Sequence, residues 1–148
     1  MPMDDSSSHE PGEDPAEPSA QPGGEVYDWY VRAIELLETG NPEAAALLLT
    51  HAHAREPSSS SVLEALGRAS FDAGRYDAAA GHFGTLTEVS PDNDYAHFGL
   101  GLSRMRLGDH AGAIEHLAMA AAMRPQRKEY DQALREARAT IRFREQRP

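Results

Sequence analysis

With 148 residues, the chain is long enough for one modest domain, and its formal net charge of −10 disfavours a nucleic-acid or anionic-membrane partner. It contains no cysteine, so disulfides and thiolate metal sites are excluded. No apolar run approaches membrane-spanning length, and the acidic N-terminus lacks the basic start and apolar stretch of a secretory signal. Arginine outnumbers lysine thirteen to one, which favours a bacterial origin, and we expect a cytoplasmic protein.

Residues 1–24 differ in composition from the rest of the chain. They are rich in proline, serine, glycine and acidic residues, and almost none of their side chains is apolar. Such a segment cannot bury enough surface to offset the entropy that it would lose on ordering. The sequence therefore predicts a disordered acidic tail at 1–24 and a folded domain at 25–148.

Glycine and proline recur through the folded part at a fixed interval of 34 residues. The glycines are Gly40, Gly74 and Gly108, and the prolines are Pro57, Pro91 and Pro125. A period of this length is typical of stacked helix pairs. Each glycine is expected to end a first helix in a left-handed cap, and each proline to close the second helix. The three copies are 26–59, 60–93 and 94–127.

Each second helix carries a small residue followed four positions later by a larger one, a spacing that lets neighbouring helices approach closely. These pairs are Ala45 with Leu49, Ala79 with Phe83, and Ala113 with Leu117. Capping residues also predict where three helices start. They are Asn41 before Pro42, Ser61 in a capping box with Glu64, and Asp109.

A final helix without a partner is expected at 128–145. Its apolar side is thin and consists of Ala133, Leu134, Ala137 and Ile141. The rest of its surface is charged and includes a basic stripe of Arg135, Arg138 and Arg142. This pattern is typical of a capping helix that keeps one face in water.

The three copies resemble the signature of the tetratricopeptide repeat family, which runs Trp, Leu-Gly, Tyr, Ala, Phe, Ala and Pro across a helix–turn–helix of this length. The second copy matches best, through Leu63, Leu66-Gly67, Gly74-Arg75-Tyr76, Ala79, Phe83 and Pro91. The first copy keeps Trp29 but has Arg32-Ala33 in place of Leu-Gly. The resemblance implies an all-α, right-handed αα-superhelix of about seven helices, the last of which is a cap.

In this family the first helices line a concave groove, and the resemblance implies that positions two, five, nine and twelve of each copy face it. These positions hold Tyr27, Tyr30, Ile34 and Leu37, then Ser61, Glu64, Arg68 and Phe71, then Tyr95, Phe98, Leu102 and Met105. Aromatic residues and methionine suit the docking of a partner helix or extended peptide. Glu64 and Arg68 lie four residues apart and are expected to pair on a solvated face. Whether the aromatic residues contact a partner or are buried by the chain itself stays open at this point.

The resemblance and the groove composition predict a non-enzymatic protein–protein interaction module, an adaptor or scaffold that docks a partner peptide or helix. Two alternatives are a structural scaffold that self-assembles as a homo-oligomer and a small chaperone for a specific client protein. Family members that clamp the C-terminal carboxylate of heat-shock chaperones use lysine and asparagine in the groove. This groove has neither, so that activity is not expected.

No metal, cofactor or catalytic site is expected. No catalytic motif places a serine, a histidine and an acid together, and no glycine-rich phosphate loop follows a strand. His51 and His53 lie two positions apart on a helix and point to opposite sides. His82 and His116 occupy the same place in successive copies, which more often reflects shared packing than metal ligation.

Overall fold

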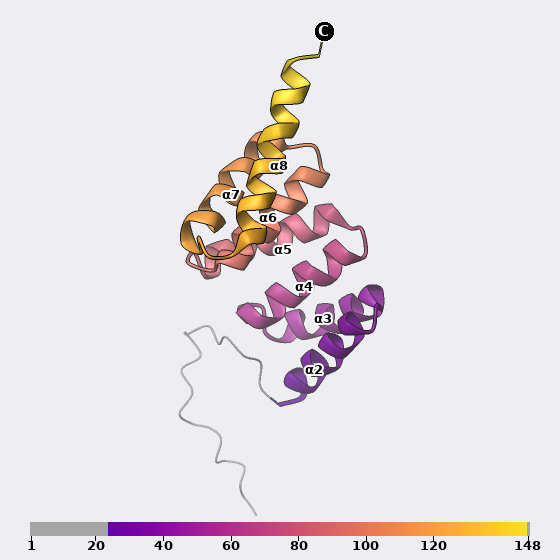
Figure 1. The fold of residues 1–148 in the computed structure, drawn as a ribbon. Helices are drawn as coiled ribbons and strands as arrows, with labels where there is room; N and C mark the ends of the chain where they lie inside the picture. Colours follow the sequence, from indigo (N-terminus) through magenta and orange to yellow (C-terminus); the bar gives the residue numbers. More distant parts are fainter. Residues whose placement is uncertain (1–23, 148) are drawn as a thin grey trace, which may run out of the picture.

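The structure is a computed structural model that describes residues 24–147, so the predicted acidic tail lies almost entirely outside the described residues. The described part consists of seven α-helices joined by short turns (Figure 1). They are α2 (Gly24–Glu38), α3 (Pro42–Arg55), α4 (Ser60–Asp72), α5 (Tyr76–Val89), α6 (Asp94–Arg106), α7 (His110–Met123) and α8 (Lys128–Glu145). The predicted all-α architecture is confirmed.

A glycine follows the first helix of each pair, as the sequence predicts. Gly40, Gly74 and Gly108 have φ angles of 83°, 80° and 89°, in the left-handed region where any other side chain is strained. The backbone turns there, and the second helix begins two residues later. The fixed interval between these glycines therefore sets the length of each helix pair.

Two predicted helix starts, at Asn41 and Asp109, have the expected position but different capping. Asp109 accepts a hydrogen bond from the Gly112 amide at 3.0 Å and caps α7 as predicted. Asn41 precedes α3, but its side-chain amide donates to the Thr39 hydroxyl and makes no capping bond. The start of α3 therefore depends on the proline that follows Asn41 rather than on a side-chain cap.

The third predicted helix start, the capping box of Ser61 and Glu64, is wrong. Ser59 caps α4 instead, and its hydroxyl accepts a hydrogen bond from the Val62 amide at 3.3 Å. Ser61 lies inside the helix, and the Glu64 side chain is free to take part in other contacts.

The helices form two layers of a curved stack. Helices α2, α4, α6 and α8 contact one another in turn, whereas α3, α5 and α7 contact only their neighbours in the chain. The first set therefore lies closer together and forms the inner layer, and the second set forms the outer layer. The result is the right-handed αα-superhelix that the sequence predicts, with α2 and α8 at opposite ends (Figure 1).

The small and large residues of the outer helices fill the core. All six predicted members, from Ala45 to Leu117, are at most 1% exposed. The ring of Phe83 lies between Gly67 of α4 and Gly99 of α6, where an added Cβ would come within 2.8 Å and 2.5 Å of ring atoms. The two glycines therefore provide the space that this ring occupies.

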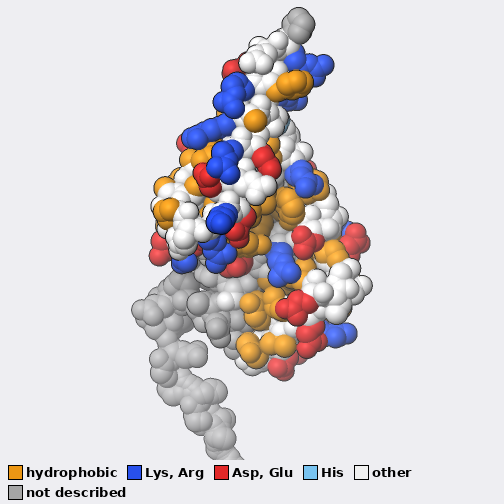
Figure 2. All heavy atoms as spheres, viewed as in Figure 1, with side chains coloured by type: hydrophobic (Ala, Val, Ile, Leu, Met, Phe, Trp, Pro, Cys, Tyr) orange, Lys and Arg blue, Asp and Glu red, His pale blue; other side chains and the backbone are white. Residues whose placement is uncertain are grey.

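The capping helix α8 buries one narrow face. Tyr130, Leu134 and Ala137 are 1%, 7% and 0% exposed, and no residue after Ala137 in the described chain is buried. Lysine and arginine side chains gather along the opposite face (Figure 2). None of the helices at residues 24–147 combines the length and the apolar composition that crossing a membrane requires.

Candidate functional site

The predicted groove residues all lie on helices of the inner layer, and we call the surface that they are expected to form the inner face. It carries Tyr27, Tyr30, Ile34 and Leu37 of α2, Glu64, Arg68 and Phe71 of α4, and Tyr95, Phe98, Leu102 and Met105 of α6. Their exposure differs widely, from 44% for Tyr27 to 6% for Leu37. Leu37 is part of the core and offers little surface to a partner.

Two tyrosines of α2 form the open end of the inner face. The ring centroids of Tyr27 and Tyr30 lie 6.4 Å apart. Burial raises the pKa of the Tyr30 hydroxyl, and the nearby charge of Glu64 raises it further, against the lowering effect of a hydrogen bond with Ser61. Tyr95 of α6 also has a raised pKa, first through burial and then in part through Glu64. Glu64 of α4 therefore lies near tyrosines from both neighbouring helices.

The Glu64 carboxyl group is half-buried and has no base within ion-pair distance among the described residues. Burial raises its pKa and Asp94 adds to the effect, whereas a hydrogen bond with Asn93 and the charge of Arg68 lower it. The predicted pair with Arg68 is wrong, because the Arg68 Nε lies 3.8 Å from the Asp72 carboxylate instead. The inner face thus holds a carboxylate whose desolvation the chain itself offsets only in part.

The third-copy residues of the inner face are covered by α8. The rings of Phe98 and Tyr130 lie 4.6 Å apart, and Leu102 and Met105 pack into a cluster with buried Leu134. These three residues are therefore partly buried by contacts within the chain. Sequence analysis missed Tyr130, although it occupies the same place in the 34-residue register as two other buried residues, Val62 and Ala96.

Phe71 is also covered, by an arginine from the next copy. Its ring packs edge-on against Tyr76 at 5.1 Å, and the Arg106 guanidinium lies 5.2 Å from the Phe71 centroid and 5.1 Å from that of Tyr76. Arg106 also donates a hydrogen bond to the Tyr76 hydroxyl. The inner-face residues outside these contacts are Tyr27, Tyr30, Ile34, Glu64, Arg68 and Tyr95, and of these we call Tyr27, Tyr30, Glu64 and Tyr95 the open half.

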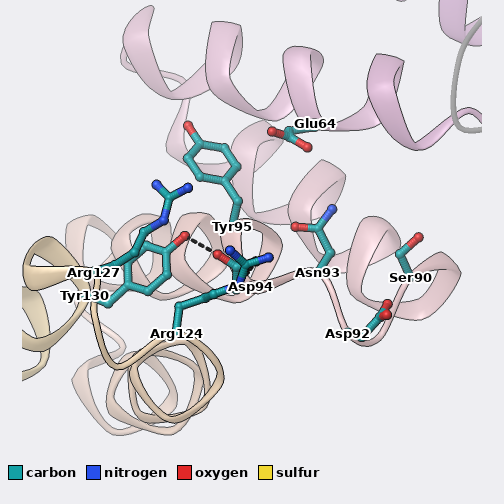
Figure 3. Close-up of a pocket in the computed structure, with 9 residues that line it drawn as sticks. All are labelled: Glu64, Ser90, Asp92, Asn93, Asp94, Tyr95, Arg124, Arg127 and Tyr130. Atoms are coloured by element: carbon teal, nitrogen blue, oxygen red, sulfur yellow. Dashed lines mark hydrogen bonds and ion pairs between the residues drawn. The ribbon is translucent and has the colours of Figure 1, made fainter.

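A pocket of about 530 Å³ adjoins the open half, and we call it the rim pocket (Figure 3). Loops before α6 and α8 supply most of its lining, which sequence analysis did not select. The lining residues are Glu64, Ser90, Asp92, Asn93, Asp94, Tyr95, Arg124, Arg127 and Tyr130. Figure 3 shows Glu64 on α4 across the pocket from the side chains of α6 and α8.

The side of the rim pocket opposite Glu64, which we call the far wall, is held in place by hydrogen bonds and ion pairs. The Tyr130 hydroxyl donates to the Asp94 carboxylate at 2.6 Å, and Arg124 Nε lies 3.6 Å from the other oxygen of that carboxylate. Burial and Asp94 both raise the pKa of Tyr130, which keeps its proton available for this bond. Arg127 pairs with Glu129 at 3.7 Å. The bases of the far wall are therefore committed to its own acids, and Glu64 receives none of them.

Four histidines lie in two contacts within the stack. His53 and His82 have ring centroids 6.1 Å apart, and His97 and His116 stack at 5.4 Å. Among residues 24–147, no group of three or more potential ligands is placed to hold a metal ion. In each of the two contacts one imidazole ring packs against another.

A backbone contact of the second pair places one of its ring protons. His97 is 4% exposed, and its Nε2 lies 2.9 Å from the Pro91 carbonyl oxygen, which can only accept. His97 Nε2 therefore carries a proton, and its Nδ1 lies 3.2 Å from His116 Nδ1, within hydrogen-bond distance.

Acidification is expected to destabilise the fold through these histidines. Burial lowers the pKa of His82, and the nearby His53 lowers it further. The pKa of His116 is also lowered, first by burial and then by Arg104 and His97. Glu115 and Asp109 raise the pKa of His116 by smaller amounts. The unfolded chain, with pKa values near 6.5, takes up these protons first. The free energy of unfolding should therefore fall as the pH drops below about 6.5.

Urea unfolding at a series of pH values, followed by circular dichroism, measures this effect. The His116→Gln variant should show a shallower pH dependence than the wild-type chain. The difference between the two curves reports the contribution of His116 alone. Glu64 is present in both chains, and its raised pKa makes the free energy of unfolding rise rather than fall as the pH is lowered. Equal slopes for the two chains would contradict the assignment.

Comparisons with known proteins agree with this architecture. The sequence profile described as Tetratricopeptide repeat matches residues 30–83 and 64–128, which together make up more than half of the chain. No curated protein sequence gives a significant match.

Three solved structures illustrate the similarity of fold. The Sgt2 TPR domain from Aspergillus fumigatus superposes with a TM-score of 0.80 at 20% identity, over 88% of this chain and 87% of that domain. The first TPR domain of Spaghetti, bound to the HSP90 peptide SRMEEVD, gives 0.77 at 13% identity, over 82% and 97%. MamA of AMB-1 gives 0.69 at 24% identity over 79% of this chain, which covers only 64% of MamA. With the repeat register, the two-layer stack and the profile match in agreement, the chain belongs to the tetratricopeptide repeat family.

Proposed function

We propose that this chain is a protein-interaction module that docks a partner segment on the open half of the inner face. Stacked helix repeats present extended concave surfaces of the kind used for protein–protein interaction. In this chain the surface that remains uncovered by α8 and Arg106 carries Tyr27, Tyr30, Glu64 and Tyr95. Tyrosines provide large contact area at little cost in conformational entropy.

The observation that carries this proposal is the half-buried Glu64 carboxylate, which has no base within ion-pair distance among residues 24–147. A charge in this setting costs stability, and such costs are common where a residue serves binding rather than folding. A lysine or arginine side chain of a partner would offset the cost by pairing with Glu64. We therefore propose that the partner segment presents a basic side chain flanked by apolar groups.

An acidic partner fits this face less well. Spaghetti binds the HSP90 peptide SRMEEVD, which ends in acidic residues. In this chain Glu64, near Asp94, would repel such a peptide. The proposed module therefore differs from a carboxylate clamp in the sign of the charge that it selects.

Affinity capture from a lysate with three forms of the intact chain tests the proposal. The groove variant combines Tyr27→Ala with Glu64→Gln, which removes the most exposed ring and the carboxylate. Leu47→Ala is the matched control, because Leu47 is 70% exposed but lies on the outer helix α3. Proteins captured by the wild type and by Leu47→Ala should be lost with the groove variant, with affinities at least about tenfold weaker. Equal capture by all three chains, at equal helicity, would contradict the proposal.

A further inference from the structure

The charges of the described chain are divided along the stack. Residues 24–94 contain twelve acids and four bases, a net charge of −8, whereas residues 95–147 contain ten bases and six acids, a net charge of +4. The acidic part includes α2 to α5, and the basic part includes α6 to α8. One end of the molecule is therefore electrostatically complementary to the other end.

The last turns of α8 extend beyond the core that the rest of the helix covers (Figure 1). Residues 138–147 contain no buried residue, and they hold four arginines against Glu145. Among them Phe143 is 62% exposed, with the Arg147 guanidinium 5.8 Å from its ring centroid. Isolated helical turns gain little stability in water, and an exposed aromatic ring between arginines is a typical contact residue of an interface.

These turns match the requirements of the open half. The open half provides the rings of Tyr27 and Tyr30 beside the Glu64 carboxylate, and the α8 end provides Phe143 among arginines. A ring on each side gives apolar contact, and an arginine supplies the ion-pair partner that Glu64 lacks among the described residues.

The two surfaces cannot meet within one molecule. Helices α2 and α8 lie at opposite ends of the stack, and the C-terminal turns of α8 point away from α2 (Figure 1). The contact must therefore join two copies. Because it would use different surfaces on each copy, it would be heterologous and leave one surface of each kind free.

We infer that residues 138–147 of one copy dock on the open half of the inner face of a second copy, with Phe143 and Arg142 as the contact residues. This inference rests on the proposed function, since it names a second copy of the chain as the partner of the same face. The charge division along the stack orients the two copies head to tail and speeds their encounter.

Sedimentation velocity of the full chain over a range of concentrations tests the inference. The mass should rise with concentration, and the association should weaken as salt is added, because the attraction is between exposed charges. The groove variant defined above and an α8 variant, Arg142→Glu with Phe143→Ala, should each associate at least about tenfold more weakly. Leu47→Ala should associate like the wild type.

Mixing the two variants provides the sharpest readout. The groove variant retains an intact α8 end, and the α8 variant retains an intact inner face. A head-to-tail contact therefore predicts that the mixture forms a one-to-one complex at concentrations at which each variant alone stays monomeric. A wild-type chain that is monomeric at every concentration and salt, or a mixture that stays monomeric, would overturn the inference.

The outcome also separates this inference from the proposed function. If the wild type is monomeric but the groove variant loses captured proteins, the partner of the inner face is a different protein and the inference alone fails. If the chain associates and neither variant changes this, the contact lies elsewhere and the inference also fails. If capture is unchanged by the groove variant, the proposed function itself fails.

Discussion

Phe83→Ala is expected to lower the free energy of unfolding by about 3–5 kcal/mol, close to the upper end for a single core substitution. The ring is 1% exposed and lies between Gly67 and Gly99. Neither glycine has a side chain that could move into the space that the ring would vacate, so the cavity should persist. Guanidinium unfolding followed by circular dichroism measures the loss, with Leu47→Ala as a surface control that changes it by less than about 0.5 kcal/mol.

The reciprocal substitution tests the cause of this effect. In the wild-type chain, Gly99→Ala would place a Cβ 2.5 Å from the Phe83 ring, and overpacking of this kind costs about 1–3 kcal/mol. In a Phe83→Leu background the same change should cost less, because the smaller side chain leaves room. Additive effects of the two substitutions would show that the ring and the glycine are not coupled.

Deletion of residues 128–148 is expected to remove the cooperative fold of the third helix pair. Burial of Tyr130 and Leu134 contributes about 1.5–3 kcal/mol each to the free energy of unfolding. Losing both contributions removes a large part of the roughly 5–15 kcal/mol that stabilises a whole domain. Leu102 and Met105 would also become exposed and favour aggregation. Light scattering and a thermal melt should show a less stable, associating chain.

A shorter deletion serves as the matched control. Removing residues 143–148 leaves all three buried residues of α8 in place and should change the free energy of unfolding by less than about 0.5 kcal/mol. The same deletion removes Phe143 and should abolish the proposed contact between copies. Equal stability of the two truncated chains would mean that α8 is not the cap of the stack.

Most of the fold could be predicted from the repeat register. Gly74 and its equivalents mark the turns because the backbone there adopts a left-handed conformation that glycine tolerates best. Ala79 and Phe83 mark a buried helix face. Both signals depend on the local backbone and on neighbours at fixed spacing. They are therefore encoded in the sequence without knowledge of the rest of the structure.

The details of capping and pairing could not be predicted, because several residues compete for the same role. Four successive serines, at positions 58–61, span the start of α4, and only the backbone geometry selects Ser59 as the cap. Arg68 has an acid four residues away on either side, and Asp72 rather than Glu64 lies within ion-pair distance. Each choice depends on side-chain directions that the spacing leaves equivalent.

The composition of the candidate site could not be predicted either, because it depends on contacts between helices that are far apart in the sequence. Phe98 occupies a groove position by register, but the ring of Tyr130 from α8 covers it. The rim pocket combines Glu64 with Arg124 and other loop residues that lie far from it in the sequence, and no local pattern links them. Such a site results from stacking, so it becomes visible only when the helices are placed.

The contacts of the stack also determine how it opens. Each helix of residues 24–147 touches only described helices one or two places away in the chain, so the stability of each segment depends on its immediate neighbours. Terminal helices have fewer neighbours and open at lower free energy than central ones. Amide hydrogens of α2 should therefore exchange with solvent sooner than those of α4 to α6. A partner bound across Tyr30 and Glu64 would connect α2 to α4 from outside and slow that exchange, so docking would order the least protected end of the molecule.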